Sequence, residues 1–374
     1  MWQAYVNDGM DPNTNGLGYR YQWGYDANGY PVLNGIKMNK YLDAASTTPA
    51  ADTDWFDQTT RTGVIQQYNV AVSNGTEKGS SYFSLGYYKN LGIIKTSDFE
   101  RFSARMNSDY KLIGNVLTVG ENFTLNRTSE VQAPGGFLSN VLQFNPSLPV
   151  YTAKGEYAGP VGGYPDRENP VARLQRNSDN RYTYWRLFGD AYLNLNPFKG
   201  FNIRSTFGLD YSQKQQRIFT YPVTEGNVAN NKNGVEAKQE HWTKWMWNAV
   251  ATYNAVMGLN RVDAMFGMEL NREDDTNFSG YKENFIILNP DYMWPDAGVG
   301  TAQSYGGGSG FSLISYFGKL NYNYDDKYMA SLTMRHDGSS RFGRNNRYAT
   351  FPSVSVGWRI NRENFLKKLH GLTI

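Results

Sequence analysis

Few residues of this chain have the type and spacing that catalysis requires. The three histidines are far apart in the sequence, and no two are spaced to share one helical face as metalloprotease ligands do. Cysteine is absent, which leaves no disulfide and no thiolate metal ligand. Neither serine of the segment DGSSRFG (337–343) has a base near it in sequence, and the segment does not meet the ligand spacing of an EF-hand calcium loop.

Two carboxylate pairs, at 274–275 and 325–326, could suggest acid-base hydrolysis. They fall at an expected strand end and in an expected turn, where solvation explains them without chemistry. We therefore expect no enzyme activity, no metal site and no cofactor.

Charged and polar residues instead recur at every second position. In the segment FERFSARMNSDYKL (99–112), Arg101, Arg105 and Asp109 alternate with Phe102 and other apolar residues. A period of two is typical of a β-strand with one polar and one apolar face. The same alternation recurs near 117–126, 185–195, 201–212, 262–270 and 354–360. If the polar face lines a lumen, its candidate lining residues are Arg101, Arg105, Asp109, Arg186, Asp190, Arg204 and Asp210.

Two interpretations of these charges stay open. They could pair with one another or with a plug, or some of them could guide a solute. Aromatic residues in two long expected loops form a second candidate set, because rings could stack on sugars or peptide side chains; the alternative is that they pack the loops themselves. This set comprises Tyr151, Tyr157, Tyr164, Tyr281, Tyr292 and Trp294.

Composition limits the class of protein. The 37 Lys and Arg residues nearly balance the 34 Asp and Glu residues, which argues against nucleic acid as a partner. Aromatic residues make up 15% of the 374 residues, yet no run approaches the roughly 18 apolar residues of a spanning helix. A membrane protein of this kind can only be a β-barrel. The first residues carry no signal peptide, so either the protein is not exported or its N-terminus has been removed.

The expected connections alternate in length. Short turns fall near 74–79, 113–115, 196–200, 256–260 and 325–327, and longer ones at about 91–98, 129–181, 223–235, 277–310 and 338–347. Bacterial barrels have short turns at the periplasmic end and longer loops outside. We therefore expect residues 1–64 to form an extracellular excursion and residues 65–374 to form the central part of a barrel.

Two stretches resemble the SusC/RagA family of TonB-dependent outer-membrane transporters of Bacteroidota. The first is SSYFSLGYYKNLGIIKTSDFERFSARMN, preceded by TDWFDQTTRTG, and the second is YFGKLNYNYDDKYMASLTMRHDGSSRFGRNNRYATFPSVSVGWRINRENF. The resemblance implies import of oligosaccharides or peptides, with a SusD-like surface lipoprotein and TonB as partners and outer-membrane lipid around the protein. It also implies a barrel of about 22 strands closed by a plug.

The expected fold is accordingly all-β: a partial antiparallel transmembrane barrel of about eleven strands. We expect no plug domain in this chain and a C-terminal truncation, because the final residues GLTI look like the start of another strand. Two other classes remain open, a passive porin or adhesin barrel and a secreted, soluble carbohydrate-binding β-protein.

Overall fold

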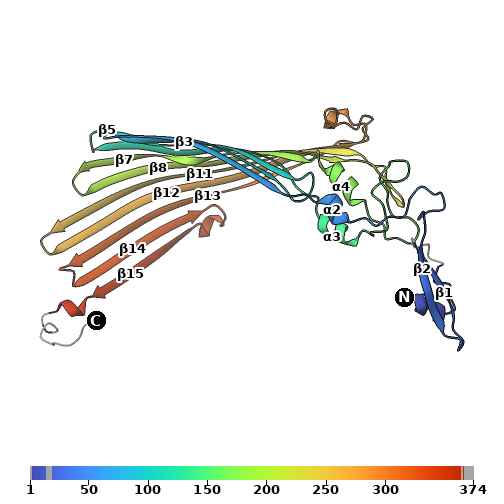
Figure 1. Ribbon diagram of the computed structural model, residues 1–374. Helices are drawn as coiled ribbons and strands as arrows, with labels where there is room; N and C mark the ends of the chain where they lie inside the picture. The colour runs from blue at the N-terminus through green and yellow to red at the C-terminus, as the bar shows by residue number, and fades with distance from the viewer. Residues whose placement is uncertain (1, 14–18, 364, 366–374) are drawn as a thin grey trace.

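A single antiparallel sheet dominates the computed structural model, which describes residues 2–13, 19–363 and 365. Eleven strands of 11 to 24 residues lie side by side in it (Figure 1). From one edge to the other they are β3 (Val64–Thr76), β4 (Gly79–Leu91), β5 (Asp98–Ile113), β6 (Leu117–Val131), β7 (Arg181–Phe198), β8 (Phe201–Thr220), β11 (Gly234–Met257), β12 (Asn260–Glu283), β13 (Gln303–Tyr324), β14 (Tyr328–Ser339) and β15 (Tyr348–Trp358). The expectation of about eleven antiparallel strands is confirmed; the proposed further strand at GLTI lies outside the described residues.

The alternation of connections is also present. The turns at one end of the sheet, here called the short-turn end, have two or three residues, such as 77–78 and 258–259. The opposite, long-connection end carries the segments 92–97, 132–180, 221–233, 284–302 and 340–347. One predicted boundary was wrong: β12 continues to Glu283 and β13 begins at Gln303, so the loop between them is shorter than the expected 277–310. The strand continues because residues 277–281 pair with both neighbouring strands, β11 and β13.

The register sets one polar and one apolar face. Residues paired across an antiparallel ladder point to the same side of the sheet. Phe102, Met106 and Phe207 lie on the apolar face with about half of their surface exposed, and no second sheet covers them in the described part of the chain. A soluble protein rarely exposes so large an apolar surface.

Glycines and aromatic rings face each other repeatedly across the ladders. Gly120 pairs directly with Tyr192, Gly267 with Phe317, and Gly338 with Tyr348. In each pair the ring lies where a Cβ of the glycine would be, 2.5, 2.4 and 2.3 Å from its nearest atom. These positions therefore accept no side chain unless the ring moves.

Smaller elements gather at the long-connection end, where Figure 1 shows α2, α3 and α4 together on one side of the sheet. They are α2 (Trp55–Thr59), α3 (Phe137–Gln143), α4 (Pro170–Asn177) and the hairpin of β9 (Val223–Glu225) and β10 (Val228–Asn230). The N-terminal α1 (Trp2–Asn7) and the hairpin of β1 (Tyr19–Tyr25) and β2 (Pro31–Met38) project beyond them. The described residues also include three short turns of 3-10 helix, η1 (Pro295–Ala297), η2 (Arg344–Asn346) and η3 (Ile360–Arg362). No helix of the described residues is long and apolar enough to cross a membrane.

Candidate functional site

The polar face brings the seven predicted lining residues together. Arg101, Arg105 and Asp109 of β5 pair with Thr128, Thr124 and Gly120 of β6. The row of Arg105 continues through Phe188 of β7 to Asp210 of β8. Neighbouring rows of the same face hold Arg186, Asp190 and Arg204. All seven side chains therefore belong to one side of the sheet, opposite Phe102 and Phe207.

Much of the charge on this face is paired. The Arg186 guanidinium donates from Nε to Oδ1 of Asp210 over 2.9 Å and from Nη2 to Oδ2 over 2.7 Å. Two parallel bonds of this kind fix the planes of both groups. The Asn122 amide lies 3.4 Å from both carboxylate oxygens of Asp190. A mixed, internally paired surface of this kind is well suited to a water-filled lumen.

Of the four arginines among the predicted lining residues, only Arg186 forms an ion pair with another described residue. The guanidinium of Arg101 lies 5.7 Å from the ring centre of Tyr88, and that of Arg204 lies 3.8 Å from the ring centre of Tyr192. Arg105 donates from Nε to the hydroxyl of Thr124 over 3.3 Å. These three side chains therefore contact rings or a hydroxyl and no carboxylate of the described residues.

A compact body forms where residues 39–63 and 132–180 meet at the long-connection end. Its core includes Trp55, whose ring lies edge-on to Phe144 at 4.7 Å between centres and whose Nε1 donates to the Asn145 carbonyl. Leu148 and Leu174 are almost fully buried in the same core. We call this unit the loop body.

Asn169 and Glu225 tie the loop body to the β9–β10 hairpin. The buried Asn169 amide donates to the carbonyls of Val150 and Ala158, over 2.9 and 2.8 Å, and its oxygen caps α4. Its backbone N–H donates to Glu225, which also pairs with Arg176 at 2.5 Å. Burial raises the pKa of the Glu225 carboxyl above its usual value, and outweighs the opposing effect of Arg176.

The candidate aromatics of the 132–180 segment have different environments. Tyr164 is buried in the loop body and its hydroxyl lies 2.7 Å from that of Ser147, so it packs the segment. Tyr151 and Tyr157 stack at 5.2 Å between ring centres, with half of Tyr151 exposed. Burial also raises the pKa of Tyr157. Tyr151 is thus the most exposed ring of this trio.

The remaining three aromatics do not join that trio. Tyr281 was expected in a loop but lies in β12, on the polar face, because the strand extends past it. The loop 284–302 packs against the opposite face, where Trp294 lies over the Arg217 guanidinium at 4.2 Å and the Pro290 carbonyl accepts a hydrogen bond from Arg217. Figure 1 shows this loop on the side of the sheet opposite to α2–α4. Tyr292 is exposed in the same loop, so the six rings form no single site.

Sequence reasoning missed Asn169, Arg176, Arg217 and Glu225. The signal for Asn169 was present, since Asn followed by Pro marks a helix start. Nothing in the sequence indicates the contact with Glu225, which lies 56 residues away. The described residues hold no cluster of three or more potential metal ligands.

No family model matches the chain, but comparison with known proteins finds relatives over most of its length. The chain is 29% identical over 373 residues to the TonB-dependent receptor SusC of Bacteroides thetaiotaomicron, a match that covers 92% of this chain and 36% of the relative. It is 30% and 31% identical to two TonB-dependent receptors of Formosa agariphila, over 86% of this chain and 32% and 33% of theirs. The chain thus spans about a third of the length of the curated relatives that it matches.

Solved structures agree on the fold. The RagAB peptide transporter matches with a TM-score of 0.69 and 20% identity, over 85% of this chain and 36% of that one. The RagAB peptide importer in its open-open state matches with a TM-score of 0.70 and 19% identity, over 87% and 37%. The expected resemblance and the partial-barrel fold are confirmed, and neither the porin or adhesin alternative nor the soluble one is supported.

Proposed function

Because the chain belongs to the SusC/RagA family of TonB-dependent outer-membrane transporters, we propose that it forms part of the barrel wall of a protein that imports oligosaccharides or peptides. The observation that carries the proposal is the sheet itself, with charged residues on one face and exposed apolar residues on the other. Such a wall separates a wet lumen from hydrocarbon. The chain's role is a conduit without catalysis, in line with relatives that are named as receptors and transporters.

The proposal orients the sheet. The long-connection end faces outward and the short turns face the periplasm, so residues 1–64 form an extracellular excursion and residues 65–374 form the central barrel. Hydrogen bonds from the 39–63 segment to the long connection 132–180, such as Thr53 Oγ1 to the Leu148 carbonyl at 2.7 Å, support the outward position of the N-terminal part. Tyr151 and the exposed aromatics of the 284–302 loop then lie outside the cell.

The partners follow from the same proposal. Energy comes through TonB acting on a plug, and a SusD-like surface lipoprotein covers the outer opening. Outer-membrane lipid contacts the apolar face. The unpaired cations Arg101, Arg105 and Arg204 then act on the solute in the lumen.

Gene deletion in the host tests the proposal. Loss of the parent gene should abolish growth on one class of oligosaccharide or peptide and leave growth on the corresponding monosaccharide or amino acids intact. Deletion of TonB should give the same defect. Growth that survives TonB loss would indicate a passive pore and contradict the proposal.

Variants of the full-length protein, expressed in the deletion strain, test the lumen residues. Arg101→Glu with Arg105→Glu should lower the uptake rate at an unchanged protein level. Lys78→Glu, in the exposed turn between β3 and β4, is the matched control and should leave uptake unchanged. Unchanged uptake and plug seating in the double variant would remove these two arginines from any transport role.

A further inference from the structure

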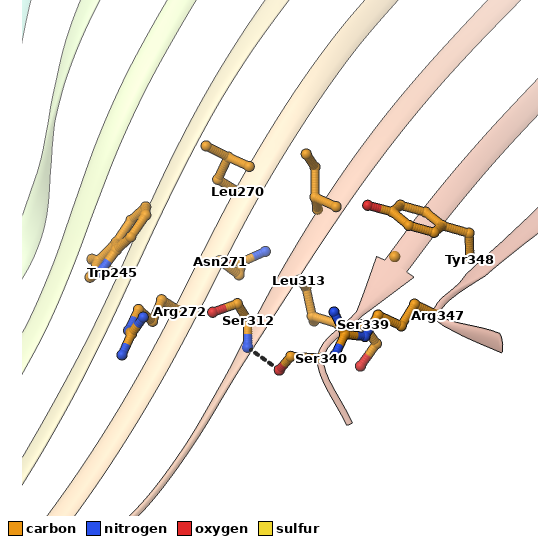
Figure 2. Close-up of a pocket in the computed structure, with 12 residues that line it drawn as sticks. Trp245, Leu270, Asn271, Arg272, Ser312, Leu313, Ser339, Ser340, Arg347 and Tyr348 are labelled. Carbon is orange, nitrogen blue, oxygen red and sulfur yellow. Dashed lines mark hydrogen bonds between the residues drawn. The ribbon is translucent and has the colours of Figure 1, made fainter. Parts of the chain in front are cut away.

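A groove crosses the apolar face where β11 to β15 approach the long-connection end (Figure 2). Figure 2 shows Trp245, Leu270 and Arg272 on one side of it and Arg347 and Tyr348 on the other. Its volume is about 290 Å³, which is enough for part of a ligand only. We call it the rim groove.

The rim groove is amphipathic along the strand direction. One cross-strand row consists of Trp245, Arg272 and Ser312, and the Ser312 N–H donates to the hydroxyl of Ser340 over 2.8 Å. The adjacent row, two residues closer to the short-turn end, consists of Leu270, Ile314, Gly338 and Tyr348. Polar groups therefore lie outward and apolar groups lie toward the middle of the sheet.

Strand lengths indicate where the boundary between the polar and the apolar row lies relative to the membrane. β14 and β15 have 12 and 11 residues, close to the roughly 9–11 that one tilted crossing of a bilayer needs. Gly338 and Tyr348 lie at the long-connection ends of these two strands. The apolar row should therefore lie at the outer edge of the hydrocarbon, and the row of Arg272 at headgroup level.

The groove carries more cations than anions. Asp274 accepts from Nε and Nη2 of Arg272, over 2.7 and 3.0 Å, which holds the guanidinium in place. Arg347 is exposed, and the one hydrogen bond that its guanidinium donates among the described residues is long, 3.4 Å to the Phe342 carbonyl. The connecting segment SSRFGRNNR (339–347) has three arginines and no carboxylate. Arg341 is turned away, with its guanidinium 3.8 Å from the ring centre of Phe311 on the polar face.

The Tyr348 wall of the groove is held in place. Its ring lies over Gly338, beside Ile314, and is parallel to the His336 ring at 5.3 Å between centres. Tyrosine is enriched at membrane–water interfaces, so this ring suits the boundary between hydrocarbon and headgroups.

We propose that the rim groove binds a phosphorylated, acylated glycolipid of the outer leaflet. Its phosphate lies against Arg272 and Arg347, the hydroxyls of Ser312 and Ser340 meet the sugar, and an acyl chain follows Leu270, Ile314 and Tyr348. Arginine suits this role because its planar fork matches phosphate oxygens. The inference depends on the outward orientation proposed above, but it requires no transport.

Native mass spectrometry of the full-length receptor in detergent tests the proposal, with bisphosphorylated lipid A, dephosphorylated lipid A and phosphatidylethanolamine as probes. The test variant combines Arg347→Gln with Arg272→Gln and Asp274→Asn, so that no unpaired carboxylate is left. Loss of two charged contacts should weaken binding of bisphosphorylated lipid A roughly tenfold or more. Binding of dephosphorylated lipid A, which offers these arginines no phosphate, should stay unchanged. Wild type should bind phosphatidylethanolamine, which has one phosphodiester and no sugar, more weakly than bisphosphorylated lipid A.

Arg341→Gln is the matched control, since it removes a charge from the same segment but on the other face, and it should leave lipid A binding intact. An unboiled gel shift establishes that each variant has folded. Equal binding of lipid A by wild type and triple variant would overturn the proposal, and so would equal wild-type affinity for the dephosphorylated form. A transport defect without loss of lipid binding, or the reverse, separates this proposal from the proposed function.

Discussion

An arginine placed on either face of β8 gives the sharpest test of how the sheet is oriented. Phe207 lies on the apolar face, 46% exposed, and its ring stacks on Trp245 at 6.3 Å between centres. Thr206, its neighbour in sequence, pairs with Tyr192 and Asn248 on the polar face. Phe207→Arg should therefore place a charge in hydrocarbon, whereas Thr206→Arg should place it in water.

The expected free-energy cost of Phe207→Arg follows from the depth of residue 207 in the membrane. Phe207 is six residues from Phe201, where β8 starts at the short-turn end. At about 3.3 Å per residue this is roughly 20 Å along the strand, or roughly 15 Å along the membrane normal for a tilt of about 40°. That depth is the middle of a hydrocarbon core about 30 Å thick. An arginine there costs about 2–4 kcal/mol, and loss of the ring contact with Trp245 adds about 1 kcal/mol.

The assay is a urea titration of the full-length protein in phosphatidylcholine vesicles, followed by tryptophan fluorescence. Phe207→Leu removes the ring without adding charge, and measures the packing loss alone. We expect Phe207→Arg to lower the free energy of unfolding by about 2–4 kcal/mol relative to Phe207→Leu, and Thr206→Arg to change it by less than about 1 kcal/mol. Equal losses for the two arginine variants, or a larger loss for Thr206→Arg, would refute the assignment of faces.

Three further predictions concern the loop body and the sheet. Asn169→Ala should lower the local opening free energy of the loop body by about 3–5 kcal/mol, because a helix cap is lost and two carbonyls lose their donor. Amide exchange in the full-length protein measures this loss, with Gln175→Ala at an exposed position of α4 as control, and unchanged protection would contradict the role of Asn169. Burial raises the pKa of Glu225 in the folded state, so its contribution to loop-body stability should be full below the ordinary glutamate pKa and should decline as pH rises through the folded-state pKa. Glu225→Gln should remove this pH dependence, which amide exchange corrected for the intrinsic exchange rate measures. An identical pH profile in the variant would count against the role of Glu225. Gly267→Val should displace the Phe317 ring and lower the free energy of unfolding by about 1–3 kcal/mol in the urea titration. Gly75→Val, at a position with open space around it, should not lower the free energy of unfolding in this way. Equal losses for the two variants would argue against the close contact between Gly267 and Phe317.

The strands could be predicted because they obey one local rule. Alternation with a period of two places Arg101 and Phe102 on opposite faces whatever the rest of the chain does. Short turns rich in Gly and Asn fixed the boundaries at the short-turn end to within a few residues. The end of β12 was missed because residues 277–283 are polar and aromatic, and only their pairing with β11 and β13 keeps them extended.

The candidate site was harder to predict. The lining residues share a face because the alternation is local, so the sequence sufficed to group them. The loops obey no such period, and their contacts are long-range: Asn169 meets Glu225, and Trp294 meets Arg217. Tyr164 and Tyr292 look alike in sequence, yet one is buried and the other exposed.

The facing pairs of glycine and aromatic ring bear on how the strands find their alignment during folding. Sliding one strand by two residues keeps every side chain on its own face, so the hydrophobic pattern cannot reject that error. After such a slip along β12, the Phe317 ring would meet the side chain of Met265 or Glu269 in place of the bare backbone of Gly267. The rings thus fit one register of neighbouring strands and clash with side chains in the two nearest registers that keep the same faces.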